Sequence, residues 1–68
     1  MNRYVVTETQ EDAFGITLED EDGNALDTIE DITGDRVLLE RMVETFNRYQ
    51  LMPECFHETI GNLIGILL

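Results

Sequence analysis

The sequence predicts an α+β domain of two layers, in which an antiparallel β-hairpin or three-stranded sheet packs against two C-terminal helices (β-β-(β)-α-α). Three observations support this prediction. Apolar residues alternate with polar ones in the first half, an Asp-Gly pair interrupts that half, and apolar residues recur at helical spacing after Thr33. A chain of 68 residues has room for one domain, so we expect residues 1–68 to fold as a unit.

Two segments of the first half have the composition of strands. Residues 3–8 (RYVVTE) are largely β-branched and aromatic, which favours a strand. In residues 13–20, Phe14, Ile16 and Leu18 alternate with small or polar residues. Because successive side chains of a strand point to opposite faces, these three residues are expected to share the buried face of the sheet.

A hairpin turn and a weaker third strand follow. Asp22 and Gly23 form a pair that suits a tight hairpin turn, because both residues tolerate the backbone angles that such turns need. Residues 25–30 could form a third strand, but Leu26 and Ile29 would lie on opposite faces of a regular one. We therefore expect a β-bulge or an early end there, and the sequence leaves open whether the third strand forms.

The second half predicts two helices. Thr33 is the expected N-cap of the first helix, with Asp35 in its first turn. Pro53 ends this region and suits the first position of the next helix. The apolar stripe of the first helix is predicted to contain Leu38, Leu39, Met42, Val43, Phe46 and Tyr49. The stripe of the second helix is predicted to contain Phe56, Ile60, Leu63, Ile64 and Leu67.

The charge distribution is the main indication of function. Fifteen Asp and Glu residues oppose four arginines, there is no lysine, and the net charge is −11. Ten of the carboxylates lie between Glu8 and Asp31, where no basic residue occurs. We expect the outer sheet face and the hairpin tips to hold most of them. Such a surface attracts cationic groups and repels phosphates, which argues against direct binding of nucleic acid.

The leading functional hypothesis is a non-catalytic inhibitor that mimics nucleic acid. Its partner would be a basic protein surface, such as that of a nucleic-acid-binding enzyme, and the contact would be salt-dependent. The residues predicted to face this partner are Glu19, Asp20, Glu21, Asp22, Asp27, Glu30 and Asp31.

The alternative is a small regulatory or assembly module whose acidity serves solubility. The last nine residues, IGNLIGILL, are strongly apolar, and two of them do not fit the inward stripe of the second helix. Exposed apolar residues there would suit a homodimer or a partner groove. The residues predicted to make this contact are Ile64, Ile66, Leu67 and Leu68.

No catalytic or metal-binding pattern is evident in the sequence. Cys55 and His57 are two residues apart, so a helix would point them to different sides. Structural zinc needs four ligands, and this pair supplies two. Counted from Asp20, Gly23 falls at the fourth position, whereas an EF-hand requires glycine at the sixth. We therefore predict no enzyme activity, no cofactor and no metal site, with a weak divalent contact at the turn as the alternative.

The expected location is the cytoplasm. A single cysteine cannot form an internal disulfide, which fits a reducing compartment. The N-terminus lacks the basic and apolar regions of a signal peptide, and no apolar run approaches the ~20 residues of a membrane span.

Two resemblances add to these expectations. The chain resembles a family of short bacterial proteins of unknown function, which implies a fold but no activity; its last helix is more apolar than that family's. The motifs that carry this resemblance are Phe14-Gly15-Ile16, Asp22-Gly23, Asp31-Ile32-Thr33, Asp35-Arg36, Met42-Val43, Asn47 and Leu51-Met52-Pro53. More loosely, in size, charge and element order the chain is similar to small phage-encoded inhibitors of CRISPR nucleases (anti-CRISPR proteins). That similarity implies that the acidic residues face arginines and lysines of a nuclease.

Overall fold

The structure is a computed structural model that describes residues 2–67, with Leu67 described only in its backbone. Three strands precede two helices: β1 (Arg3–Gln10), β2 (Ala13–Glu19), β3 (Ala25–Thr33), α1 (Arg36–Arg48) and α2 (Phe56–Leu67). A single 3₁₀ turn, η1 (Pro53–Cys55), leads directly into α2. The predicted α+β arrangement is therefore confirmed, and the third strand forms.

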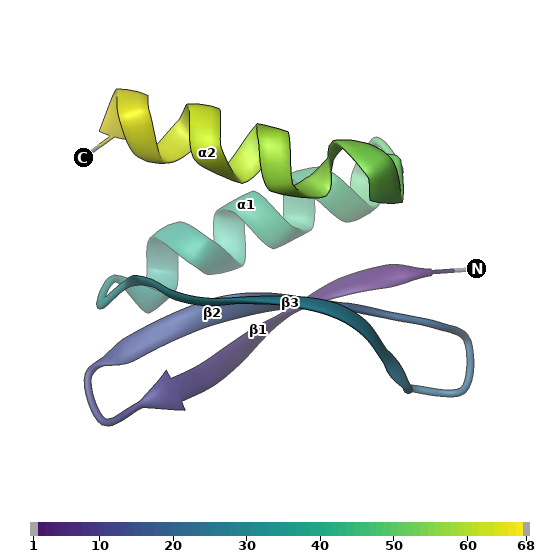
Figure 1. The fold of residues 1–68 in the computed structure, drawn as a ribbon, viewed down its shortest axis with the longest axis horizontal. Coiled ribbons are helices and arrows are strands. Elements are labelled where there is room, and N and C mark those ends of the chain that lie inside the picture. The colour runs from purple at the N-terminus through teal and green to yellow at the C-terminus, as the bar shows by residue number, and fades with distance from the viewer. Residues whose placement is uncertain (1, 68) are drawn as a thin grey trace.

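The strands lie in the order β1-β2-β3, and each neighbouring pair is antiparallel. Both helices cover the same face of this sheet (Figure 1). The β1–β2 turn and the β2–β3 turn lie at opposite ends of the sheet, as they must when three consecutive strands alternate in direction (Figure 1). This arrangement decides where the charged turns are placed.

β3 is irregular at two points and continues to Thr33, so of the two alternatives that the sequence left open the β-bulge is confirmed and the early end is wrong. Its pairing register with β2 shifts between Phe14 and Ile16 and again between Leu18 and Glu19. At the first shift, Asp31 takes a positive φ of 52°. Gly15 of β2 faces this bulge so closely that an added Cβ would collide with the carbonyl oxygen of Ile29. The glycine thus permits β3 to bend across β2.

The core fills the space between the sheet and the helices. The ring of Tyr4 on β1 lies edge-on to Phe46 of α1 at 5.5 Å between centroids and to Phe56 of α2 at 5.1 Å. Such edge-to-face pairs are favourable beyond the apolar area they bury. Ile16 and Leu18 of β2 are buried, as predicted. Among the side chains that the structure describes, the buried apolar residues are Tyr4, Ile16, Leu18, Ile32, Leu39, Phe46, Phe56 and Ile60.

Two predictions about α1 are wrong. The N-cap is Asp35, whose Oδ1 accepts a hydrogen bond from the backbone N of Leu38 at 3.1 Å. Thr33 instead ends β3, and its hydroxyl accepts from the backbone N of Asp35 at 3.2 Å. Tyr49 does not extend the buried stripe, because it is the C-cap residue and is 75% exposed. The next residue, Gln50, has a φ of 53° and turns the chain toward η1.

Within the described residues, no helix has the length and apolar character needed to cross a membrane.

Candidate functional site

The ten carboxylates between Glu8 and Asp31 gather at the two ends of the sheet. The "first-turn cluster", beside the β1–β2 turn, consists of Glu8, Glu11, Asp12, Glu30 and Asp31. The "second-turn cluster", beside the β2–β3 turn, consists of Glu19, Asp20, Glu21, Asp22 and Asp27. The clusters are separate because consecutive hairpins of an antiparallel sheet turn at opposite ends.

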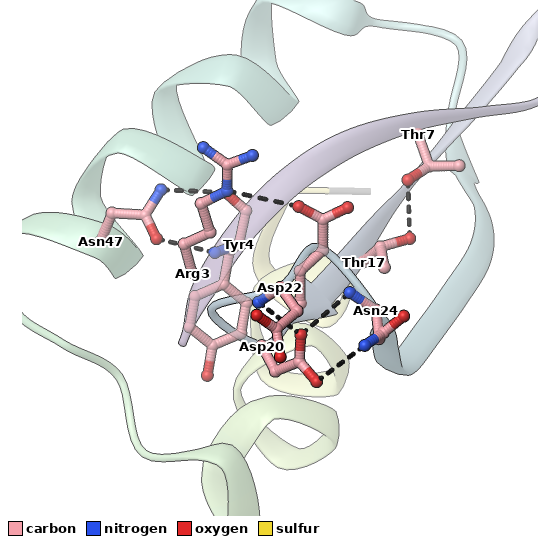
Figure 2. Close-up of polar contacts among 9 residues, drawn as sticks. Arg3, Tyr4, Thr7, Thr17, Asp20, Asp22, Asn24 and Asn47 are labelled. Carbon is pink, nitrogen blue, oxygen red and sulfur yellow. Dashed lines mark hydrogen bonds and ion pairs between the residues drawn. The ribbon is translucent and has the colours of Figure 1, made fainter. Parts of the chain in front are cut away.

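The middle of the outer sheet face carries hydroxyl groups instead of carboxylates. Thr7, Thr17 and Thr28 lie side by side on the three strands, with Oγ1–Oγ1 distances of 2.6 Å and 3.1 Å (the first pair is drawn in Figure 2). The outer sheet face was expected to hold most of the carboxylates together with the hairpin tips, and the middle of that face carries these threonines instead. The cause is the side-chain alternation of β2, which places Ala13, Gly15 and Thr17 outward.

The tips of the two turns act as separate charges in salt solution. The seven residues of β2 span about 23 Å, at about 3.3 Å per residue. The Debye length at physiological ionic strength is about 8 Å, so the tips of the two turns are screened from one another. On β3 the two clusters come closer, because Asp27 and Glu30 are three residues apart, about 10 Å at about 3.3 Å per residue.

Asp20 organises the β2–β3 turn. Its Oδ1 accepts from the backbone N of Asp22 and of Asn24, both at 2.9 Å, and its Oδ2 accepts from Asn24 Nδ2 at 3.4 Å (Figure 2). The turn itself is closed by Gly23, which has a φ of 83°. The hydrogen bond from the Asn24 backbone, with further bonds from the turn, lowers the pKa of Asp20. Asp20 is therefore an ionised structural residue of the turn.

Two other predicted docking residues have partners within the protein. Glu19 forms an ion pair with Arg3, with 3.3 Å between Arg3 Nε and Glu19 Oε1. Asp27 lies on the helix-facing side of β3, and its Oδ2 is 2.7 Å from Nε2 of His57 on α2. Asp27 thereby joins α2 to the sheet. Among the second-turn carboxylates, Glu21 and Asp22 are exposed at the tip.

The remaining two predicted docking residues belong to the opposite end of the sheet. Glu30 is exposed there. Asp31 accepts from the hydroxyl of Thr9 at 2.8 Å and from Gln10 Nε2 at 3.4 Å, so it ties β3 to the end of β1. The structure thus brings together five of the seven predicted residues and separates these two from them.

The predicted set omitted three carboxylates that share the end with Glu30 and Asp31. Glu8, Glu11 and Asp12 are all exposed there. The hairpin topology predicts this grouping, because the β1–β2 turn and the C-terminal end of β3 lie at the same end of the sheet. The order of residues alone does not reveal this grouping, because Asp12 and Asp31 are far apart in the chain.

The groups with chemical reactivity do not converge. Cys55 is half-buried and His57 is exposed. Among the described residues, no three side chains of His, Cys, Asp or Glu lie close enough to hold a metal ion. Burial, with smaller effects of Cys55 and Glu54, raises the pKa of Tyr4, whose hydroxyl donates to the carbonyl oxygen of Leu51 at 2.7 Å. This hydrogen bond satisfies the buried hydroxyl of Tyr4 within the fold.

A hollow of about 200 Å³ lies beside the C-terminal end of α1. It is lined by Asn2, Tyr4, Phe46, Asn47, Gln50, Leu51 and Pro53. None of these residues is a carboxylate, a histidine or a cysteine, and the hydroxyl of Tyr4 donates to the carbonyl oxygen of Leu51.

The structure describes the side chains of two of the four apolar residues predicted to make an oligomer or partner contact. Ile64 is half-buried, whereas Ile66 is 78% exposed. The side chain of Leu67, and Leu68 as a whole, lie outside the described residues.

No protein-family model, curated protein or solved structure matches this chain. The two resemblances of the sequence therefore stay predictions.

Proposed function

We propose that this protein is a non-catalytic acidic binding domain that docks the tip of its second-turn cluster on a basic protein surface. The partner class is a nucleic-acid-handling enzyme, such as a CRISPR nuclease, and docking inhibits it by occupying cationic groups that would otherwise hold phosphates. The protein's net charge of −11 and the absence of lysine support a cationic partner.

The observation that carries the proposal is the ordered acidic tip of the β2–β3 turn. Glu21 and Asp22 are exposed at a turn that the side chain of Asp20 holds with three hydrogen bonds. A surface that is ordered before binding loses less conformational entropy on association than a flexible one. Carboxylates on such a turn form charge-assisted hydrogen bonds to arginine with defined geometry.

The division of the carboxylates into two clusters restricts how this protein could imitate the charges of a nucleic acid. Duplex DNA presents one charge per about 1.7 Å of axis without interruption. In this protein the two acidic turns are about 23 Å apart along β2, at about 3.3 Å per residue, and the hydroxyl groups of Thr7, Thr17 and Thr28 lie between them. The proposed contact is therefore local, between one turn and one group of basic side chains, instead of an imitation of a long stretch of duplex.

The test compares charge reversal at the two ends of the sheet. Glu21→Lys with Asp22→Lys removes the proposed contact, and Glu11→Lys with Asp12→Lys changes the net charge equally at the other end. Binding to and inhibition of a panel of CRISPR nucleases are measured for both double variants. We expect the first to lose binding at least about tenfold more than the second, because bonds to charged partners are worth about 1.5–3 kcal/mol each.

Salt dependence provides the second measurement. Displacing counterions from a basic site makes the binding constant fall steeply as salt rises.

Equal losses of binding in the two double variants would leave only a general effect of net charge and would overturn docking by the second turn. Asp20 and Asp27 are unsuitable for reversal, because the first shapes the turn and the second contacts His57.

A further inference from the structure

We propose that the outer edge of β3 binds an extended basic segment of a partner protein, which adds to the sheet as a fourth strand. The segment is rich in arginine or lysine and forms hydrogen bonds to the backbone of β3. This inference goes beyond the function proposed above, because it depends on the backbone of β3 and not on the side chains at the tip of the second turn.

β3 is an edge strand whose backbone is used by β2 on one side. The strand order β1-β2-β3 gives β3 a single neighbour in the sheet. In an antiparallel pair, alternate residues direct their N–H and C=O groups away from the neighbouring strand. Figure 1 shows β3 crossing the front of the sheet, with no described helix or strand in front of it. Such a row of backbone groups is a template for another strand.

The opposite edge of the sheet is more occupied. α1 packs against β1, and the side-chain amide of Asn47 hydrogen-bonds to both backbone polar groups of Tyr4. α2 reaches β3 through a side-chain contact, that of His57 with Asp27. Of the two edges, β3 is therefore the more accessible template for a further strand.

One stretch of β3 is regular enough to pair. Residues 27–29 lie in continuous register with residues 16–18 of β2. Asp31, with its φ of 52°, interrupts the strand after Glu30. Because an irregularity of this kind limits pairing along an edge, we expect the bound segment to be short and centred on Thr28.

Charge decides which segment suits this edge. β3 carries Asp27, Glu30 and Asp31 and no basic residue. Within the described residues, the ion pairs made by arginine involve carboxylates of other elements. Opposite charges on neighbouring strands are favourable, and like charges directly opposite one another are destabilising. A second copy of β3 would place carboxylates beside carboxylates, so the edge disfavours self-pairing and favours a basic segment.

The experiment titrates the full chain with a peptide of about ten residues in which arginine alternates with threonine. The control peptide has the same sequence with every backbone nitrogen methylated, so it keeps the charges and cannot donate hydrogen bonds to a strand. We expect the control to bind at least about tenfold more weakly, because several backbone hydrogen bonds are lost. Binding of the first peptide should slow hydrogen exchange, measured by NMR, at amides of residues 26–30.

Two charge-reversal variants test the position of the contact. Glu30→Lys places a like charge beside the bound segment, and Glu8→Lys makes the same change on β1, where Glu8 is also exposed. We expect Glu30→Lys to weaken binding of the first peptide at least about fivefold more than Glu8→Lys does. Circular dichroism verifies that both variants fold.

Each result decides the question. Tighter binding of the unmethylated peptide, with slower exchange in β3, supports the added strand. Equal affinities of the two peptides would reduce the contact to general charge attraction and overturn the proposal. Absence of binding at millimolar peptide in low salt overturns it too, as does slower exchange confined to β1 or the helices. Equal effects of Glu30→Lys and Glu8→Lys would overturn the assignment to β3.

Discussion

The side-chain amide of Asn47 pairs with both backbone polar groups of Tyr4. Its Oδ1 accepts from the Tyr4 N at 2.7 Å, and its Nδ2 donates to the Tyr4 O at 2.9 Å (Figure 2). β1 is an edge strand, so these two groups point away from β2 and would otherwise be unpaired. Asn47 thus acts at this position as a neighbouring strand would, and it fixes the C-terminal end of α1 against the sheet.

Replacing Asn47 with alanine should destabilise the fold. Two hydrogen bonds of about 0.5–1.5 kcal/mol each are lost, and the higher helix propensity of alanine offsets part of the cost, which leaves a net loss of about 1–2 kcal/mol. Urea unfolding followed by circular dichroism measures this change. Asn62→Ala is the control, because Asn62 is exposed on α2 and should change stability by less than about 0.5 kcal/mol. Equal stabilities of the two variants would show that the amide contact does not hold α1.

Gly15→Ala and Gly61→Ala should have opposite effects. A Cβ at Gly15 collides with backbone atoms of β3, which cannot move aside as a flexible side chain can, so we expect a loss of about 1–3 kcal/mol or more. A Cβ at Gly61 meets nothing within 4 Å in the middle of α2, so alanine should stabilise by about 0.5–1 kcal/mol. Thermal and urea unfolding measure both values. A neutral Gly15→Ala would contradict the close approach of β3 to β2.

The turn bonds of Asp20 should make stability depend on acid pH. Its folded-state pKa lies below the ordinary value of 3.8, so its contribution is present above that value and is lost as the pH falls through the folded-state pKa. Asp20→Ala should lower the urea midpoint at neutral pH and remove this part of the acid dependence. Asp22→Ala, at the neighbouring exposed position, should leave the acid dependence nearly intact. Parallel pH profiles for the wild type and Asp20→Ala would contradict the role of Asp20.

The local elements were predictable from sequence, because each depends on near neighbours. The alternation around Phe14, Ile16 and Leu18 predicted the central strand, and the mismatch of Leu26 and Ile29 predicted a bulge in β3. The N-cap was misplaced because Thr33 and Asp35 are both good capping residues by type. The choice between them depends on how far β3 continues, and it continues through Thr33.

The candidate site was predictable in composition but not in placement. Glu21 and Asp22 were expected at an exposed turn, and they lie there. Asp27 and Asp31 have the same chemistry, yet one contacts His57 of α2 and the other contacts Thr9 of β1. Such contacts join residues far apart in the chain, and side-chain type alone does not specify them.

By itself, the sequence determined that strands precede two helices, most of both helical stripes and the strong negative charge, because periodicity and composition act over a few residues. The tertiary structure alone decided that the carboxylates form two clusters, that Asn47 pairs with the edge strand at Tyr4, and that Ile66 is exposed. The physical reason is that these relations follow from strand direction and from the packing of both helices on one face of the sheet.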